Sequence, residues 1–257
     1  MLEFVDSLPF TLTNAQKRVT KDILSDLNKN QPMNRLLEGD VGSGKTVVAS
    51  IAAYTAYLNN FQTAIMAPTE ILAEQHFKTL KTLLSGFDVK IGLITSNRTQ
   101  TNLNSEASLE EILAKSDILV GTHSLIYEKI DFDRLGLAVI DEQHRFGVQQ
   151  RGKLIQKGRA PHTLTMTATP IPRTIALTMY GDLDLSVLDE MPKGRKEVKT
   201  WLVPQRKRGA AYEWVKKQIK KENSQVFVIC PLIEESDKEG MEDIKAAKAE
   251  YQKLSQS

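Results

Sequence analysis

Short apolar runs alternate with longer amphipathic segments along most of the chain. The runs that predict buried strands cover residues 35–38, 63–67, 89–95, 117–121, 135–140 and 162–167. The segments that predict helices cover residues 14–27, 46–58, 71–84, a short stretch after residue 108, and residues 173–179. Because strands and helices alternate, the sequence predicts an α/β domain whose mostly parallel sheet is flanked by helices. Ligands bind such sheets beyond the carboxyl ends of the strands.

Small polar residues mark several of the predicted helix starts. Thr13 and Gln16 have the spacing of a capping box, in which each side chain bonds the backbone N–H of the other residue. Thr69 and Ser108 are predicted to cap two later helices. Residues 96–108 are polar and irregular, and they predict a surface loop.

A change in composition near residue 191 divides the chain. Residues 1–190 are predicted to form one complete domain, and residues 191–197, which contain proline, glycine and basic side chains, are predicted to form a hinge. Residues 198–257 are predicted to begin a second α/β unit that is too short to close a core of its own. The elements expected in it are strands at residues 198–203 and 225–230 and charged helices at residues 207–221 and 238–255.

Composition sets few limits on function. The 257 residues carry a net charge of +2, so any binding of nucleic acid would depend on a local basic face. Cys230 is the single cysteine, which excludes an intrachain disulfide and a cysteine-based zinc cluster. No apolar run reaches the ~18 residues of a membrane span, and the acidic, proline-containing N-terminus is unlike a signal peptide. We therefore expect a soluble, cytoplasmic protein.

The most informative motif follows the first predicted strand. It fits the pattern G-x-x-x-x-G-K-[ST] and consists of Gly39, Asp40, Val41, Gly42, Ser43, Gly44, Lys45 and Thr46. The glycines allow a tight turn whose N–H groups face phosphate oxygens. Lys45 supplies positive charge for the β- and γ-phosphates, and Thr46 offers a hydroxyl to Mg²⁺. The motif therefore predicts a phosphate-binding loop for ATP and Mg²⁺.

A second motif stands at the end of a later apolar strand. Asp141 and Glu142 follow this strand as in a Walker B element, where Asp141 is expected to hold Mg²⁺ and Glu142 to orient or deprotonate the attacking water. His144 is interpreted either as a surface residue or as a relay from the γ-phosphate. Thr167 and Thr169, at the end of the next strand, are interpreted either as strand-end caps or as partners of His144. With the phosphate-binding loop, the two acids predict a phosphoryl-transfer site.

Several longer stretches resemble the superfamily 2 helicases and, more closely, the RecG family of bacterial branched-DNA helicases. They are GDVGSGKT (residues 39–46), APTEILAEQH (67–76), GTHSLI (121–126), DEQHRFGVQQR (141–151), TATPIPRT (167–174) and GDLDLSVLDEMPKGRK (181–196). The Mfd family of transcription–repair translocases is the nearest alternative, but it reads DEEH where this chain reads DEQH. The resemblance covers about residues 8–236. It implies a RecA-like P-loop NTPase domain followed by the truncated start of a second RecA-like domain.

The resemblance also implies roles for individual residues. Gln16 would read adenine, with Phe10 as a packing partner, although the spacing of Gln16 also fits the helix cap. Thr167 and Thr169 would couple hydrolysis to movement. The residues that would track the DNA backbone are Pro68, Thr69, Glu70, Gly121, Thr122, His123 and Arg173.

The activity that the resemblance implies is that of an ATP-dependent DNA helicase or translocase for fork regression and branch migration in DNA repair and recombination. Branched or forked DNA would be its partner. A wedge domain and a second motor domain, which supplies arginine fingers, would lie outside this sequence. We therefore expect this chain to bind ATP weakly and to hydrolyse little of it. The alternatives are a nucleotide-binding module without motor function, an Mfd-like translocase on duplex DNA, and an RNA helicase.

Overall fold

The computed structural model describes residues 2–102, 108–169, 183–192, 194, 198–231 and 247–255. The chain falls into two compact units, Met1–Arg195 and Lys196–Ser257, and each is described by itself. The division lies inside the segment that we predicted as a hinge. The helix predicted at residues 173–179, and Arg173 with it, lies outside the described residues.

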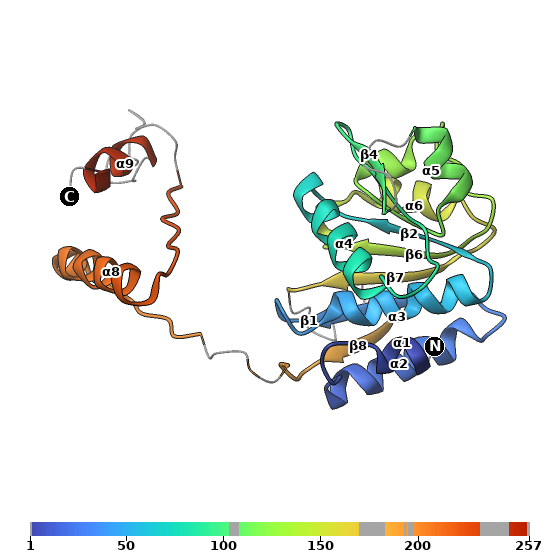
Figure 1. Ribbon diagram of the computed structural model, residues 1–257, viewed down its shortest axis with the longest axis horizontal. Coiled ribbons are helices and arrows are strands. Elements are labelled where there is room, and N and C mark those ends of the chain that lie inside the picture. The colour runs from blue at the N-terminus through green and yellow to red at the C-terminus, as the bar shows by residue number, and fades with distance from the viewer. Residues whose placement is uncertain are drawn as a thin grey trace. The chain divides into compact units, whose positions relative to one another are not determined.

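One sheet forms the centre of the first unit (Figure 1). Its spatial order is β4-β3-β5-β2-β6-β7-β1-β8, and neighbouring strands are parallel except for β3 and β4. In chain order the strands are β1 (Asn34–Gly39), β2 (Gln62–Met66), β3 (Ile91–Ile94), β4 (Thr99–Thr101), β5 (Ile118–Gly121), β6 (Leu135–Asp141), β7 (His162–Thr167) and β8 (Asp184–Leu188). Because β6, β7 and β1 are neighbours and parallel, the segments that follow them meet beyond the carboxyl ends of these strands.

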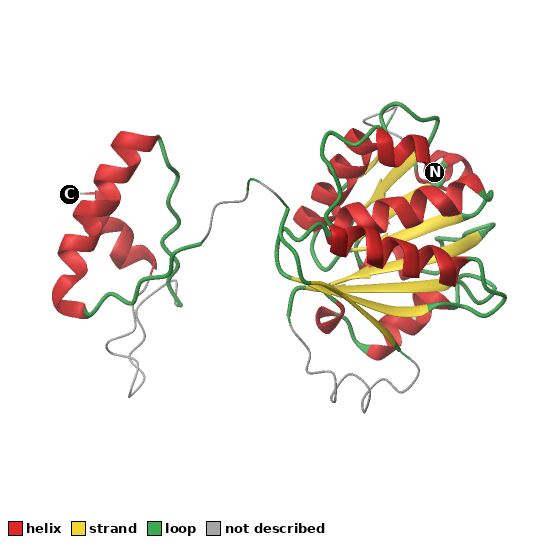
Figure 2. Cartoon of the chain, turned by 90° about the horizontal axis from the view of Figure 1, so that it is seen from below, coloured by secondary structure: helices red, strands yellow, loops and turns green. Residues whose placement is uncertain are grey.

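Helices cover both faces of this sheet (Figure 2). They are α1 (Leu2–Asp6), α2 (Asn14–Leu27), α3 (Lys45–Leu58), α4 (Glu70–Leu83), α5 (Leu109–Lys115) and α6 (Val148–Ile155), with the 3₁₀ turns η1 (His123–Ile126) and η2 (Gln143–Arg145). One hydrophobic cluster joins α1, α2, α3 and α4 to one face of the sheet, and a second joins α5, α6 and η1 to the other. Within the described residues, no helix combines the length and the apolar character that crossing a membrane requires.

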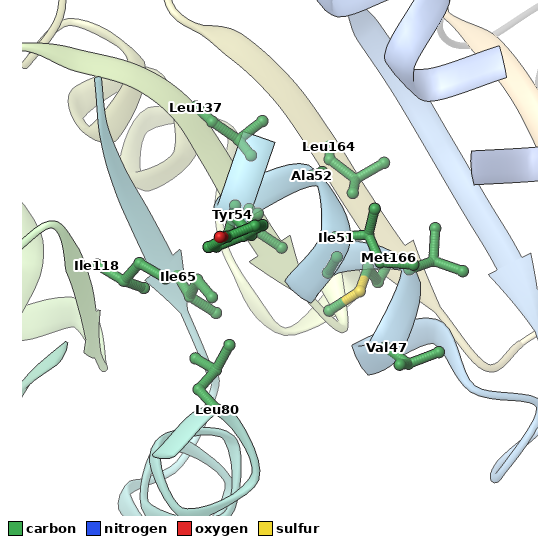
Figure 3. Packing of buried hydrophobic residues seen from close by; sticks show 14 of the residues in the cluster. Val47, Ile51, Ala52, Tyr54, Ile65, Leu80, Ile118, Leu137, Leu164 and Met166 are labelled. Carbon is green, nitrogen blue, oxygen red and sulfur yellow. The ribbon is translucent and has the colours of Figure 1, made fainter. Parts of the chain in front are cut away.

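Alternate side chains of the central strands enter opposite clusters. In β2, Ile65 belongs to the cluster beneath α1–α4, whereas Ala64 and Met66 belong to the cluster beneath α5 and α6. Figure 3 shows the first of these clusters, in which Ile51 of α3 lies near Leu164 of β7. Because both faces of the sheet are buried, its strands read in the sequence as nearly continuous apolar runs.

The strands and helices predicted for the described part of the first unit are confirmed, with boundaries that shift by a few residues. The predicted side-chain caps at the starts of three helices are also confirmed. Thr13 and Gln16 complete a reciprocal capping box at the start of α2. Thr69 and Ser108 each accept a hydrogen bond from an N–H in the first turn of α4 and α5, respectively.

The loop predicted at residues 96–108 is wrong in part, because it contains β4. This strand is only three residues long, and it forms by pairing antiparallel with β3 at the edge of the sheet. The hydrophobic pattern also did not predict α1 or β8. The partner of β8 is β1, which lies far away in the sequence, and such a pairing leaves little local signal.

The second unit contains, among its described residues, η3 (Gln205–Lys207), α8 (Arg208–Glu222) and α9 (Ala247–Ser255). The basic helix predicted at residues 207–221 is confirmed as α8, and α9 matches the described part of the helix predicted at residues 238–255. The strands predicted at residues 198–203 and 225–230 are wrong. Neither segment has a strand neighbour in the described part of this unit, and Leu202 and Phe227 are 99% and 86% exposed. An isolated extended segment leaves its backbone groups unpaired, so apolar character alone does not make it a strand.

Candidate nucleotide-binding site

The predicted nucleotide motifs meet beyond the carboxyl ends of neighbouring strands in the first unit. The loop of residues 39–46 follows β1, Asp141 and Glu142 lie at the end of β6, and Thr167 and Thr169 lie at the end of β7 between them. The segments predicted to contact DNA follow β2 and β5, on the other side of β6. The strand order therefore brings together residues that are more than a hundred positions apart in the sequence.

The phosphate-binding loop is tightest at Gly44. This residue has a φ of +93°, and a Cβ atom added to it would lie 2.2 Å from Nε2 of Gln16. A side chain at this position would therefore meet both an unfavourable backbone conformation and a steric clash. The next residue, Lys45, begins α3, so the loop leads into a helix N-terminus, as a phosphate-binding loop requires.

Gln16 connects the start of α2 to this loop. Its Oε1 accepts a hydrogen bond from the Thr13 N–H at 2.9 Å, and its Nε2 donates to the Ser43 carbonyl at 2.8 Å. The side chain is buried. The capping interpretation of Gln16 is confirmed, and both ends of its amide are already bonded. Reading of adenine by Gln16 stays a prediction, and it would require these bonds to be shared or exchanged.

Lys45 folds back over its own loop. Its Nζ donates to the Gly39 carbonyl at 2.6 Å and to the Asp40 carbonyl at 3.2 Å. Burial lowers the pKa of Lys45, and the negative charges of Asp141, Glu142 and Asp40 oppose this effect. The ammonium group thus lies within electrostatic reach of the two acids after β6, and phosphate oxygens would compete with carbonyl oxygens for it.

Asp141 is held by a histidine that we did not single out in the sequence. Its Oδ2 lies 2.7 Å from Nε2 of His76, and both side chains are buried. His76 belongs to α4, which packs against β3 and β5 rather than on the loop of Lys45. Within the described residues, Oδ1 of Asp141 has no hydrogen bond, so one carboxylate oxygen is engaged and the other remains available.

Glu142 has an unusual backbone conformation. Its φ of 48° and ψ of 57° are left-handed, which is uncommon for a residue with a side chain and is found at functional sites. Oε2 of Glu142 lies 3.5 Å from Nδ1 of His144, and this buried oxygen lacks a hydrogen-bond partner among the described residues. A carboxylate oxygen in this state can accept a proton or a hydrogen bond from water.

The two threonines after β7 bond each other. Oγ1 of Thr167 and Oγ1 of Thr169 are 2.8 Å apart, and the Thr169 N–H donates to Thr167 Oγ1 at 3.2 Å. In the described part of the chain, neither hydroxyl bonds His144, whose side chain is partly exposed and lies beside Glu142 instead. The interpretation of these threonines as a local strand-end cap is therefore confirmed, and the contact with His144 is wrong for this conformation.

The residues of the site fit a magnesium–nucleotide complex. The described residues contain no cluster of three or more His, Cys, Asp or Glu side chains that could hold a metal alone. Mg²⁺ is usually bound through one or two carboxylates together with phosphate oxygens and water. Thr46 at the start of α3 and Asp141 at the end of β6 are the protein groups that would hold it.

The segments predicted to contact DNA are built from short turns. Thr69 caps α4 through a 3.3 Å hydrogen bond from the Leu72 N–H, and the Glu70 carboxylate accepts from Nδ2 of Asn97 at 3.1 and 3.3 Å. Pro68 directly precedes this cap. After β5, Gly121 packs so tightly that an added Cβ would lie 2.4 Å from the carbonyl oxygen of Ile94, while Thr122 is buried and His123 is exposed.

A pocket of about 350 Å³ is lined by residues 94–99, from the end of β3 onward, and by Ser124 and later residues, which follow β5. Its polar lining comprises Thr95, Ser96, Asn97, Arg98, Thr99, Ser124, Tyr127 and Lys129. The sequence predictions missed this basic, hydroxyl-rich surface, because residues 96–108 were interpreted only as a polar, irregular surface loop. Arg98 follows β3 and Lys129 follows β5 in the sequence, and these two cationic side chains were the signal that could have revealed this surface.

His76 is the other residue that the sequence predictions missed. The positions Ala73, Phe77 and Leu80 form the buried stripe of α4, and His76 lies within this stripe. A polar side chain at a buried helical position requires a partner. This pattern could have identified His76 as bonded, although not its partner.

The chain is similar to known proteins over most of its length. A family model described as DEAD/DEAH box helicase matches residues 13–178. The ATP-dependent DNA helicase RecG of Synechocystis sp. is 50% identical over 254 residues, which cover 99% of this chain and 30% of that protein. The ATP-dependent DNA helicase RecG of Bacillus subtilis is 51% identical over 239 residues, which cover 93% of this chain and 35% of that protein.

A solved structure of RecG bound to a three-way DNA junction matches with a TM-score of 0.72 and 45% sequence identity, over 86% of this chain and 29% of that one. The predicted resemblance to the RecG family and the predicted RecA-like helicase fold are confirmed. The chain spans about a third of the length of the relatives that it matches. Because the family model covers more than half of its residues, the chain belongs to the DEAD/DEAH box helicase family, whose members use nucleotide.

Proposed function

We propose that this chain is the first motor domain of an ATP- and Mg²⁺-dependent DNA helicase that acts on branched or forked DNA. Its reactions would be fork regression and branch migration in DNA repair and recombination. The observation that carries the proposal is that the loop of Lys45 follows β1 and the acids Asp141 and Glu142 lie at the end of β6, with one strand between these two in the same parallel part of the sheet. The identity to RecG helicases along nearly the whole chain supports it.

The residues of the site divide the work of phosphoryl transfer. Backbone N–H groups of residues 39–46 and the Lys45 ammonium bind the β- and γ-phosphates. Thr46 and Asp141 would hold Mg²⁺, which would neutralise charge on the phosphate oxygens. Glu142 orients the attacking water or takes its proton, and its Oε2, which has no hydrogen-bond partner in the described part of the chain, suits either task.

Coupling of the nucleotide site to movement would depend on the threonines after β7. Thr167 and Thr169 are hydrogen-bonded to each other at the end of β7, which lies between β1, the strand of the phosphate-binding loop, and β6, the strand of Asp141. A change at either neighbouring strand end would therefore reach their shared hydrogen bond. His144, whose Nδ1 lies 3.5 Å from Oε2 of Glu142, is proposed as a relay between the γ-phosphate and another part of the protein.

The DNA backbone would run along the strand ends of β2, β5 and β3. The residues proposed to form this path are Pro68, Thr69, Glu70, Gly121, Thr122, His123 and Arg173, and we add the pocket residues Arg98 and Lys129. Hydroxyls, amides and cationic side chains bind phosphates without regard to sequence, which suits a motor that must move along DNA. Glu70 is best assigned to positioning, because its carboxylate would repel phosphate and is bonded to Asn97.

Binding of a forked DNA, measured by fluorescence anisotropy over a range of salt concentrations, tests this proposal. Arg98→Gln and Lys129→Gln should each weaken binding and lower the slope of log K against log salt by about one charge. Lys21→Gln, an exposed lysine on α2, is the matched control and should leave the slope unchanged.

The nucleotide dependence of the same measurement separates a motor from a simple binding module. A motor domain should change its DNA affinity when a non-hydrolysable ATP analogue and Mg²⁺ are added. If neither the added nucleotide nor the substitutions of Arg98 and Lys129 changed the DNA affinity, the result would instead support a nucleotide-binding module without motor function.

A further inference from the structure

A buried histidine on α4 has no part in the functions assigned so far. His76 is 7% exposed and lies among the apolar positions of its helix, such as Ala73 and Phe77. Burying an imidazole is unfavourable unless its nitrogen atoms find partners, whereas a leucine or phenylalanine would fill the same space without that cost. The presence of histidine therefore calls for an explanation beyond packing.

The partner of His76 is the carboxylate at the end of β6. Nε2 of His76 and Oδ2 of Asp141 are 2.7 Å apart, and Asp141 is 8% exposed. An ionised carboxylate only accepts hydrogen bonds, so Nε2 must carry the hydrogen in this pair. The bond limits rotation of the Asp141 side chain, because its partner sits on a helix that is itself packed into the core.

We propose that His76 is a positioning residue for Asp141. By holding Oδ2, it directs the other oxygen, Oδ1, to the place where a magnesium–nucleotide complex would meet it. This inference rests on the proposed function, because it gives Asp141 the role of metal carboxylate. Partners that orient a metal-binding carboxylate typically change metal affinity by 10–100-fold when they are removed.

The His76–Asp141 bond also joins two regions of the molecule. α4 begins at Glu70, in the segment proposed to contact DNA, and His76 follows six residues later on the same helix. At a rise of 1.5 Å per residue this separation is about 9 Å. The helix that follows the proposed DNA-contact segment therefore also carries the group that orients Asp141.

Three substitutions of His76 test the positioning role. Glutamine places its Nε2 amide at about the reach of the imidazole Nε2, asparagine is too short to do so, and leucine only fills the space. The measurement is the Mg²⁺ concentration at half-maximal binding of a fluorescent ATP analogue to the complete chain. We expect His76→Gln to resemble the wild type, and His76→Asn and His76→Leu to require 10–100-fold more Mg²⁺.

Binding of the analogue in EDTA and the thermal unfolding midpoint serve as controls, because a loss of folding would alter both. If His76→Leu does not fold, the contrast between glutamine and asparagine decides. Equal Mg²⁺ requirements in these two variants, whether shifted or not, would contradict the proposal, since only one of them can restore the bond.

An NMR measurement of the imidazole nitrogen atoms in the nucleotide-free chain tests the bond independently. We expect the tautomer with hydrogen on Nε2 in the wild type, and its loss in Asp141→Ala. Hydrogen on Nδ1 alone would overturn the inference. If the wild type bound no nucleotide at any Mg²⁺ concentration, the proposed function would fail, and the tautomer would still decide whether His76 orients Asp141.

Discussion

The side-chain amide of Gln16 donates a hydrogen bond to the main-chain carbonyl of Ser43 at 2.8 Å, so the first turn of α2 and the phosphate-binding loop are joined. The same side chain completes the capping box with Thr13. A helix cap and a nucleotide loop therefore depend on one buried glutamine. Any change at Gln16 should alter folding stability and nucleotide binding together.

Substitution of Gln16 by alanine should show this double effect. It leaves the partly buried Thr13 N–H and the buried Ser43 carbonyl without their partner, and an unpaired group that is fully buried costs about 1–3 kcal/mol. We expect a lower midpoint in urea denaturation and weaker binding of a fluorescent ATP analogue. The exposed neighbour Lys17 provides the control, since Lys17→Ala should change neither quantity appreciably. Weaker nucleotide binding without any loss of stability would assign Gln16 to adenine reading alone.

Substitution of Gly44 by alanine should be far more damaging than the same change at Gly86. At Gly44 the new Cβ would approach Gln16 to 2.2 Å at a φ of +93°, whereas at Gly86 it would meet no atom within 4 Å. The left-handed conformation alone costs about 1–2 kcal/mol. We expect Gly44→Ala to destabilise the chain and to abolish nucleotide binding. Similar unfolding midpoints for the two alanine variants would show that the loop is not constrained as described.

The pH dependence of stability should depend in part on His162, the first residue of β7. Burial lowers the pKa of His162, against the opposing charge of Asp26, and Nδ1 accepts a hydrogen bond from the Met33 N–H at 3.0 Å. As the pH falls below the ordinary value of 6.5, the unfolded chain gains a proton before the folded chain does. Stability should therefore decrease with falling pH in this window, until the folded histidine is also protonated.

An asparagine at position 162 isolates this effect, because its Oδ1 can accept the same hydrogen bond and does not titrate. Urea denaturation at pH 7.5 and pH 5.5 measures the difference. We expect His162→Asn to lose less stability than the wild type between the two values, by a small amount because His162 is only half-buried. Identical losses in the two proteins would exclude His162 as a source of the pH dependence.

Local patterns predicted most of the first unit. The capping box of Thr13 and Gln16 is a contact between residues three positions apart, and its spacing alone located the start of α2. The apolar runs located the central strands, because those strands are buried on both faces. The phosphate-binding loop and the acids after β6 were recognisable because each occupies a short stretch whose residue types are dictated by phosphate and metal chemistry.

Contacts between distant residues explain what the sequence did not reveal. His76 and Asp141 are 65 positions apart, and no local pattern names one as the partner of the other. β8 exists because β1 offers it an edge. The converse error occurred at residues 198–203 and 225–230, where apolar character suggested strands but no neighbouring strand is present in the described part of the second unit. Strand formation is a property of a pair of segments, whereas helix caps and loops are properties of one.

Binding of a fluorescent ATP analogue with Mg²⁺, compared between the wild type, Lys45→Ala and the exposed control Lys81→Ala, shows whether the loop of residues 39–46 holds the nucleotide. We predict saturable, Mg²⁺-dependent binding to the wild type and to Lys81→Ala, and loss of that binding in Lys45→Ala. Equal binding to all three proteins would contradict the account, because the nucleotide would then be held away from the loop of residues 39–46.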